Sequence, residues 1–174
     1  MANLCQKRIL ISCYTTSIKT PILIEIFVEE FKISKSNIQI EKGDVVSATL
    51  ETPIEATKQL FREARKIGAK TILNAAPAIL DAETIFPLTV YLIVNETELS
   101  IFAKTKIPQS AKDVVISVRK LKSGTTNVIA TLGKKGAVVL IAEETIFVEG
   151  RRVKAIDTTA AGDCFVGAFA VALQ

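Results

Sequence analysis

The chain has 174 residues, of which 49% are hydrophobic and 23% are charged, and its 22 basic and 18 acidic residues give a formal charge of +4. This composition fits one globular domain and excludes extended disorder. The sequence contains no histidine, which excludes Ser-His and Cys-His nucleophiles as well as histidine-ligated metals. The basic residues are not interleaved with aromatic ones and there is no tryptophan, so we expect no nucleic-acid partner.

The apolar runs of the chain are far shorter than the roughly 20 residues that a membrane helix needs. The N-terminus shows neither a sustained apolar signal core nor a small-residue cleavage site. We therefore expect no membrane partner and a cytoplasmic location.

Residues 1–43 form an N-terminal segment to which the sequence assigns no fold. Residues 8–14 fit a strand, and residues 22–31 fit a strand or a helix equally, because apolar residues recur at both periods. From residue 44 to residue 174, apolar strand-like runs alternate with helical patterns. This alternation predicts one α/β domain with a largely parallel sheet.

The domain begins with a predicted strand at residues 45–51 that leads into a helix. Thr52 is expected to cap this helix, with Pro53 at the first helical position and Glu55 completing a capping box. Gly68 is expected to end the helix, because glycine readily adopts the left-handed conformation of a C-cap.

The rest of the domain repeats this strand and helix alternation. The further predicted strands cover residues 70–74, 91–94, 127–132, 137–142 and 145–149. The last two strands fit an antiparallel pair. Helices are predicted at residues 109–122 and from Ala161 onward.

The strongest chemical signal lies in the run from Asp157 to Ala170, where a strand end is followed by small residues and then by a helix. The small side chains of Ala160, Ala161 and Gly162 let backbone N–H groups approach an anion closely, and the helix dipole adds roughly half a positive charge. These three residues are therefore predicted to form an anion hole.

Asp163 follows the anion hole in the first turn of the same helix, where the helix field favours the ionised carboxylate. A carboxylate is a weak base for a hydroxyl. It suffices for phosphoryl transfer through a loose transition state, in which positioning and charge neutralisation dominate. The alternative is that Asp163 only caps the helix.

The run from Asp157 to Ala170 resembles the C-terminal signature of the PfkB carbohydrate kinases, the ribokinase-like superfamily, in the form closest to ribokinases. The resemblance implies that Asp163 is the catalytic base and contacts the substrate, and that Gly162 binds ATP. It also implies a monovalent-cation site for K⁺ at Asp157 and Thr159.

The segment Asn95-Glu96-Thr97-Glu98 follows a predicted strand and resembles the Asn-x-x-Glu motif of the family. The resemblance implies that Asn95 bonds a nucleotide phosphate and that Glu98 holds Mg²⁺ through water, which suits the oxygen ligands of this ion. Taken alone, Asn95 and Glu98 are more typical of a solvated helix start.

Residues 131–136 resemble the nucleotide-binding loop that follows a strand in the family. Threonine hydroxyl and glycine N–H groups can reach phosphates, and the glycines allow a tight turn. The alternative is a plain Gly-x-x-Gly hairpin turn with exposed lysines. The resemblance implies ATP contacts for Thr131, Leu132, Gly133, Lys134, Lys135 and Gly136.

The segment Leu50-Glu51-Thr52-Pro53 resembles the one whose glutamate hydrogen-bonds a sugar hydroxyl in ribokinases. This assigns Glu51 to the substrate, in line with the rule that ligands lie beyond the carboxyl ends of parallel strands. The alternative is an acid favoured by a helix N-terminus. Asn74-Ala75-Ala76-Pro77 resembles the Asn-Pro-Ala-Pro loop of the family, with Ala75 where proline is usual, so we expect a less rigid loop.

Together these motifs imply a three-layer ribokinase-like α/β fold with a mostly parallel sheet and an antiparallel pair near the C-terminus. Because the resemblance covers residues 44–174, we expect a partial, middle-to-C-terminal portion of that fold. It implies an ATP- and Mg²⁺-dependent kinase that phosphorylates a sugar hydroxyl, converting ribose to ribose 5-phosphate. The alternatives are an inactive truncated remnant, a nucleotide-binding fragment, and a PfkB kinase for another sugar or a nucleoside. The expected partners are a sugar, ATP and a second copy in a homodimer.

Overall fold

The structure, a computed structural model, describes residues 40–151, 153 and 160–173, together with the backbone of three short strands nearer the N-terminus. These strands are β1 (Ile9–Ser12), β2 (Val28–Glu29) and β3 (Lys32–Ile33). β2 and β3 pair with one another in antiparallel fashion, whereas β1 joins the main sheet beside β4.

A seven-stranded sheet forms the middle of the fold, in the order β1, β4, β5, β6, β7, β8, β9. The first five of these strands are parallel, and β8 and β9 are each antiparallel to the preceding strand. The strands after β3 are β4 (Val45–Thr49), β5 (Lys70–Asn74), β6 (Tyr91–Asn95), β7 (Asn127–Thr131), β8 (Gly136–Ile141) and β9 (Glu144–Glu149). The mostly parallel sheet and the antiparallel pair near the C-terminus are confirmed.

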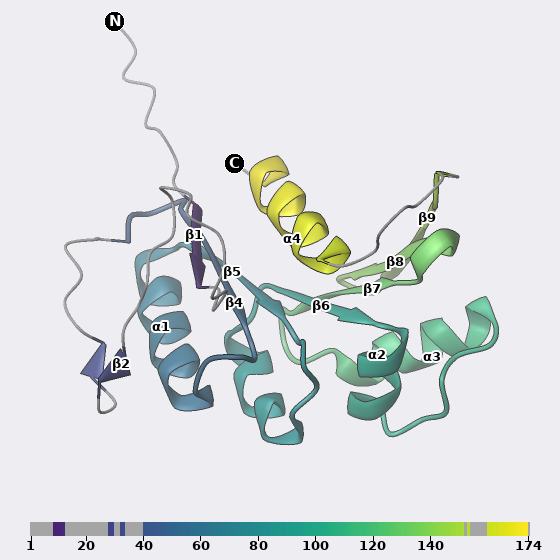
Figure 1. Cartoon of the computed structure of the whole chain (residues 1–174), viewed down its shortest axis with the longest axis horizontal. Coiled ribbons are helices and arrows are strands. Elements are labelled where there is room, and N and C mark those ends of the chain that lie inside the picture. The colour runs from purple at the N-terminus through teal and green to yellow at the C-terminus, as the bar shows by residue number, and fades with distance from the viewer. Residues whose placement is uncertain are drawn as a thin grey trace, which may run out of the picture.

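Helices cover both faces of this sheet (Figure 1). One face carries α1 (Ile54–Ile67), the 3₁₀ helix η1 (Leu80–Leu88), α2 (Glu96–Phe102) and α3 (Ala111–Leu121). On the opposite face, α4 (Ala161–Ala172), the yellow helix, is the one helix among the residues that the structure describes. The expected three-layer α/β fold is therefore confirmed.

The 3₁₀ helix η1 is absent from the elements that the sequence predicts. Pro87 lies inside it, and an internal proline argues against a helix. The buried Thr126 hydroxyl lies 2.8 Å from the Phe86 carbonyl oxygen and 2.9 Å from that of Thr89. These contacts at its C-terminal end, made by a residue distant in sequence, help to hold η1 in place.

Two apolar clusters hold the three layers together. Neighbouring residues of one strand point to opposite faces, so Leu73 packs toward α1 and its neighbours while Ile72 packs toward α4. The same division separates Val94 from Ile93 in β6. Burial on both faces explains why the middle residues of β6 (92–94) and β7 (128–130) are all apolar.

The start of α1 differs from the expected capping box. Pro53 occupies the N-cap position, and no side chain caps the helix. The Thr52 hydroxyl instead donates to the Thr49 carbonyl oxygen at 3.2 Å and lies 2.8 Å from the Thr57 hydroxyl. Because Thr52 is engaged by these partners, it does not reach the amide that a capping box would use. The predicted end at Gly68 is confirmed, since Gly68 adopts φ 86° and its N–H bonds the last turn.

The turn between β7 and β8 lies directly against the end of β9. A side chain built on Gly136 would overlap the backbone of Val148 and Gly150, and φ at Gly136 is 101°. Gly133, in the same turn, has φ 52° but faces open space. Gly136 is therefore required by both backbone conformation and close approach, and Gly133 by conformation alone.

Replacing Gly136 by alanine should lower the free energy of unfolding by about 3 kcal/mol, because the added methyl group meets backbone that no rotamer change can relieve. Gly133→Ala is the matched control and should cost about 1 kcal/mol, the penalty of a left-handed alanine. Urea denaturation of both variants measures these losses. Equal losses would contradict the close approach at Gly136.

Candidate functional site

The carboxyl ends of the parallel strands bring polar residues to one edge of the sheet. Thr49, the last residue of β4, pairs with Asn74, the last of β5. Asn95, the last residue of β6, pairs with Thr131, the last of β7. In open α/β sheets this edge is where ligands bind. The structure thus brings two of the predicted ATP-binding residues, Asn95 and Thr131, side by side.

The C-terminal half of helix α4 lies over the amino ends of two neighbouring strands. Its C-cap residue Leu173 accepts a hydrogen bond from Lys70 at the amino end of β5, and Phe169 contacts Tyr91 at the amino end of β6. From Leu173 back to Asp163 the helix rises about 15 Å, so Asp163 lies at the end of α4 that is remote from these two contacts.

Within the described part of the chain, no side chain caps the N-terminus of α4. Ala160, at the N-cap position, has the left-handed conformation (φ 57°, ψ 15°). Ala160, Ala161, Gly162 and Asp163 are all exposed, and the space where a Gly162 side chain would point is empty to 4 Å. The first amides of α4 are thus free to meet an anion, as helix N-termini do.

Asn95 and Glu98 form a reciprocal capping box at the start of α2. The Asn95 side-chain oxygen accepts from the Glu98 N–H at 2.9 Å. The Glu98 carboxylate accepts from the Asn95 backbone N–H and side-chain amide, each also at 2.9 Å. Glu98 is only 7% exposed, so the solvated helix start considered as an alternative does not describe it.

Burial raises the pKa of Glu98 above its ordinary value of 4.5, although the hydrogen bonds from the backbone and side chain of Asn95 act in the opposite direction. Each carboxylate oxygen accepts one protein hydrogen bond and keeps a lone pair. Mg²⁺ retains several waters in most protein sites, so this carboxylate fits contact with the ion through water. Among the residues that the structure describes, no group of three or more acidic or sulfur ligands forms a direct metal cage.

The loop from Thr131 to Gly136 is a short 3₁₀ turn at the same edge. The Leu132 N–H donates to the Gly136 carbonyl oxygen at 2.8 Å, which closes the turn. The Thr131 hydroxyl lies 3.4 Å from the Val94 carbonyl oxygen. Lys134 and Lys135 are exposed, so their cations can approach a bound phosphate or remain in solvent.

Glu51 lies in the turn between β4 and α1. Its backbone N–H donates to the Thr49 hydroxyl at 3.4 Å, and the neighbouring Leu50 N–H donates to the Ala76 carbonyl oxygen at 3.0 Å. These bonds fix the backbone of the turn while the Glu51 side chain is exposed. The sequence motifs do not single out Thr49, although it lies at the end of a strand, two residues before Glu51.

The expected cation-site residues Asp157 and Thr159 lie outside the described residues. Within the described part of the chain, no helix is long and apolar enough to span a membrane.

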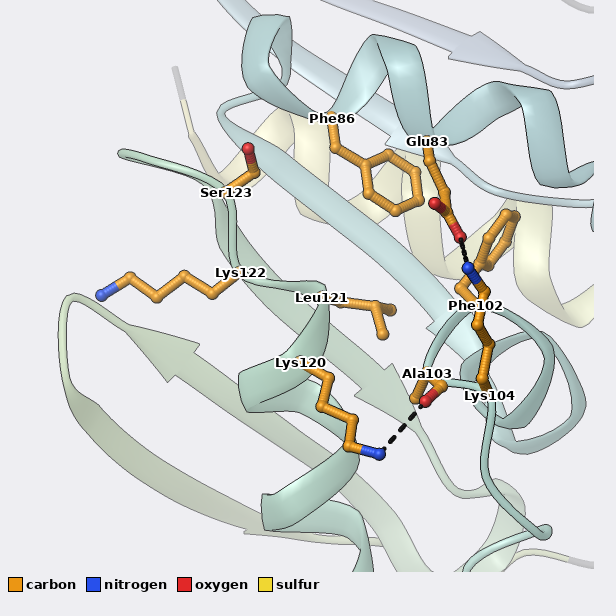
Figure 2. Close-up of a pocket in the computed structure, with 9 residues that line it drawn as sticks. All are labelled: Glu83, Phe86, Phe102, Ala103, Lys104, Lys120, Leu121, Lys122 and Ser123. Carbon is orange, nitrogen blue, oxygen red and sulfur yellow. Dashed lines mark hydrogen bonds and ion pairs between the residues drawn. The ribbon is translucent and has the colours of Figure 1, made fainter.

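A pocket of about 370 Å³ lies away from this edge, between η1 and the C-terminal ends of α2 and α3 (Figure 2). Lys120 donates to the Ala103 carbonyl oxygen at 3.4 Å, and Lys104 lies 3.7 Å from the Glu83 carboxylate. The two lysines thus neutralise a helix C-terminus and an acid, as expected near helix ends. None of the predicted site residues lines this pocket.

Replacing Glu98 by glutamine should change how stability depends on pH. Because the folded-state pKa of Glu98 is raised, its carboxyl group favours folding below the ordinary value of 4.5, and this contribution is lost as pH rises through the raised pKa. The free energy of unfolding of the parent chain should therefore fall relative to that of Glu98→Gln as pH rises above 4.5. Urea denaturation at a series of pH values measures the difference.

Asp113→Asn is the matched control, because Asp113 holds the same third position in the capping box of α3. Hydrogen bonds from the side chain and backbone of Ser110 lower the pKa of Asp113. The Asp113 carboxylate therefore stabilises the fold above its ordinary pKa, and this stabilisation is lost as pH falls through the lowered pKa. Relative to Asp113→Asn, the free energy of unfolding of the parent chain should rise with pH, which is the opposite of the trend at Glu98. If the difference in free energy of unfolding changed with pH in the same direction for both variants, the effect of burial on Glu98 would be contradicted.

Comparison with known proteins connects this geometry to a family. A family model described as pfkB family carbohydrate kinase matches residues 20–174. Ribokinase of Haemophilus influenzae is 34% identical over 144 residues, which is 83% of this chain and 47% of the relative. Ribokinase of Staphylococcus aureus is 39% identical over 132 residues, which is 75% of this chain and 43% of the relative.

A solved structure shows the same fold. Arabidopsis thaliana ribokinase complexed with ribose and ATP is 29% identical, with a TM-score of 0.68 over 74% of this chain and 42% of that chain. The chain thus spans less than half the length of the relatives that it matches. With its sheet order and its C-terminal signature, the family match shows that this chain belongs to the pfkB family of carbohydrate kinases.

Proposed function

We propose that this chain transfers the γ-phosphoryl group of MgATP to a hydroxyl of a sugar, with ribose as the substrate and ribose 5-phosphate as the product. Two observations support the proposal: Asp163 lies in the first turn of α4, which no described side chain caps, and the carboxyl edge of the sheet brings Asn95 and Thr131 together. The names of the relatives, ribokinases from bacteria and a plant, support ribose over other sugars.

In the proposed reaction, Asp163 accepts the proton of the attacking sugar hydroxyl. The sugar oxygen forms a bond to the γ-phosphorus, the bond from that phosphorus to the β,γ-bridging oxygen breaks, and ADP leaves. The transition state is loose, so the proton leaves late and a carboxylate suffices as base. The amides of Ala160, Ala161 and Gly162 neutralise charge on the phosphoryl oxygens.

On the nucleotide side, Asn95 bonds a phosphate oxygen, and the loop from Thr131 to Gly136 supplies hydroxyl and amide donors. Mg²⁺ supplies neutralisation of the phosphate charge when bound. Glu98 orients its waters from the capping box, in which each carboxylate oxygen retains a lone pair. On the sugar side, Glu51 accepts a hydrogen bond from a sugar hydroxyl. The K⁺ site at Asp157 and Thr159, the homodimer and the cytoplasmic location stay predictions.

Asp163→Asn should lower the turnover number by at least about 10²-fold, because the amide cannot take the proton. Nucleotide affinity should change little, since the backbone amides of α4 remain. A coupled assay of ADP release on ribose measures turnover, and isothermal titration with MgATP measures binding.

Asp113→Asn is the matched control, because Asp113 is the third residue of α3 as Asp163 is of α4. It should leave turnover within twofold of the parent chain. Normal turnover by Asp163→Asn would show that Asp163 is only a helix-capping acid. Binding of MgATP without turnover by the parent chain would support the nucleotide-binding alternative instead.

Glu51→Gln should raise the KM for ribose by roughly tenfold while leaving the KM for ATP unchanged, because it replaces a charge-assisted hydrogen bond with a neutral one. Glu55→Gln, in the first turn of α1, is the control and should alter neither value. Initial rates with each substrate varied in turn measure both constants. An equal rise in the two KM values would remove Glu51 from the sugar site.

A further inference from the structure

We propose that Thr57 is a positioning residue for Glu51, because through the hydroxyl of Thr52 it holds the turn that carries Glu51. The role of Glu51 toward the sugar rests on the proposed function, whereas the effect of Thr57 on the turn does not. Thr57 lies on the buried face of α1, four residues before Phe61, and is only 3% exposed. A buried hydroxyl destabilises the fold unless it is hydrogen-bonded.

The partner of Thr57 is the hydroxyl of Thr52, at a distance of 2.8 Å between the two oxygens. The Thr52 hydroxyl also donates to the Thr49 carbonyl oxygen at 3.2 Å. A hydroxyl has one proton to donate, and Thr49 takes that of Thr52. The Thr57 hydroxyl is therefore the donor to Thr52, and the two bonds connect α1 through the turn to the end of β4.

The two threonines hold special positions at the start of α1. Pro53 is the N-cap, so Thr52 is the residue before the N-cap and Thr57 is the fourth residue of the helix. Apolar side chains at these two positions often pack together and fix the angle at which the chain enters a helix. In α1 a hydrogen bond between two hydroxyls takes the place of that contact. It fixes the direction of the chain at Thr52, the neighbour of Glu51.

Glu51 depends on this bond because its own contacts are weak. Its backbone N–H donates to the Thr49 hydroxyl at 3.4 Å, a long hydrogen bond, and its side chain is exposed. Among the residues that the structure describes, the bond between Thr52 and Thr57 is the one side-chain hydrogen bond that ties this turn to α1. Thr57 therefore limits the positions that Glu51 can adopt.

The test compares Thr57→Val, which removes the hydroxyl and keeps the branched shape, with Thr57→Ser, which keeps the hydroxyl. Thr126→Val is the matched control, because the Thr126 hydroxyl is likewise buried and hydrogen-bonded but lies just before the amino end of β7. Backbone NMR relaxation measures the order parameter of the Glu51 N–H without any ligand. Initial rates with each substrate varied in turn give the KM values for ribose and for ATP.

Thr57→Val should lower the order parameter of the Glu51 N–H from about 0.85, which is typical of a rigid backbone, to below about 0.6. It should raise the KM for ribose about fivefold, the effect of one neutral hydrogen bond, and leave the KM for ATP within about twofold of the parent chain. Thr57→Ser should keep both readouts at the parent values. Thr126→Val should lower thermal stability and change neither readout.

The effect on ribose should pass through Thr52 and Glu51. In a chain that already carries Glu51→Gln, Thr57→Val should raise the KM for ribose by less than about twofold, because the two changes disturb one contact. Thr52→Val should reproduce the lower order parameter of the Glu51 N–H. It takes the place of Thr57→Val should that variant fail to fold, since Thr52 is less buried.

An unchanged order parameter of the Glu51 N–H in Thr57→Val would overturn the proposal. Equal rises in the two KM values, or a fivefold rise for ribose that persists in the Glu51→Gln chain, would also overturn it, because Thr57 would then act elsewhere. Absence of turnover in every chain, the parent included, would contradict the proposed function. The order parameter would then decide the role of Thr57 in the turn.

Discussion

The parallel pairing of β4, β5, β6 and β7 is the constraint on which the rest of the structure depends. Because these strands run in one direction, their carboxyl ends meet at one edge, and residues far apart in sequence, such as Asn95 and Thr131, become neighbours. Each strand must be apolar on both faces to be covered by helices. The polar last residues of these strands, Thr49, Asn74, Asn95 and Thr131, therefore meet at this edge, and phosphate and sugar recognition is proposed there.

The two faces of the sheet contribute differently to that edge. On the face with α2, the capping box of Asn95 and Glu98 holds a carboxylate beneath the surface, with its pKa raised by burial. On the other face, α4 presents open backbone amides and Asp163. We propose that these two faces serve the two charges of MgATP: the Glu98 carboxylate would hold Mg²⁺ through water, and the first amides of α4 would bind phosphate oxygens.

Much of this arrangement can be predicted from the local sequence. The apolar runs predict the strands, and the two runs on either side of Glu143 predict the antiparallel pair of β8 and β9. The parts that the sequence does not show depend on contacts across the fold. The Thr52 hydroxyl has local alternatives to capping, and it bonds Thr49 and Thr57. The burial of Glu98 and the reach of Lys70 to α4 require tertiary packing that no local spacing encodes.

We propose that the nucleotide binds at the carboxyl edge and at no other surface. A titration of backbone amide NMR signals with a non-hydrolysable MgATP analogue, in the presence of ribose, tests this directly. We expect shifts at Asn95, Gly133 and Gly162 and none in the pocket beside Lys104 and Lys120. Shifts confined to that pocket, with none at the carboxyl edge, would contradict it.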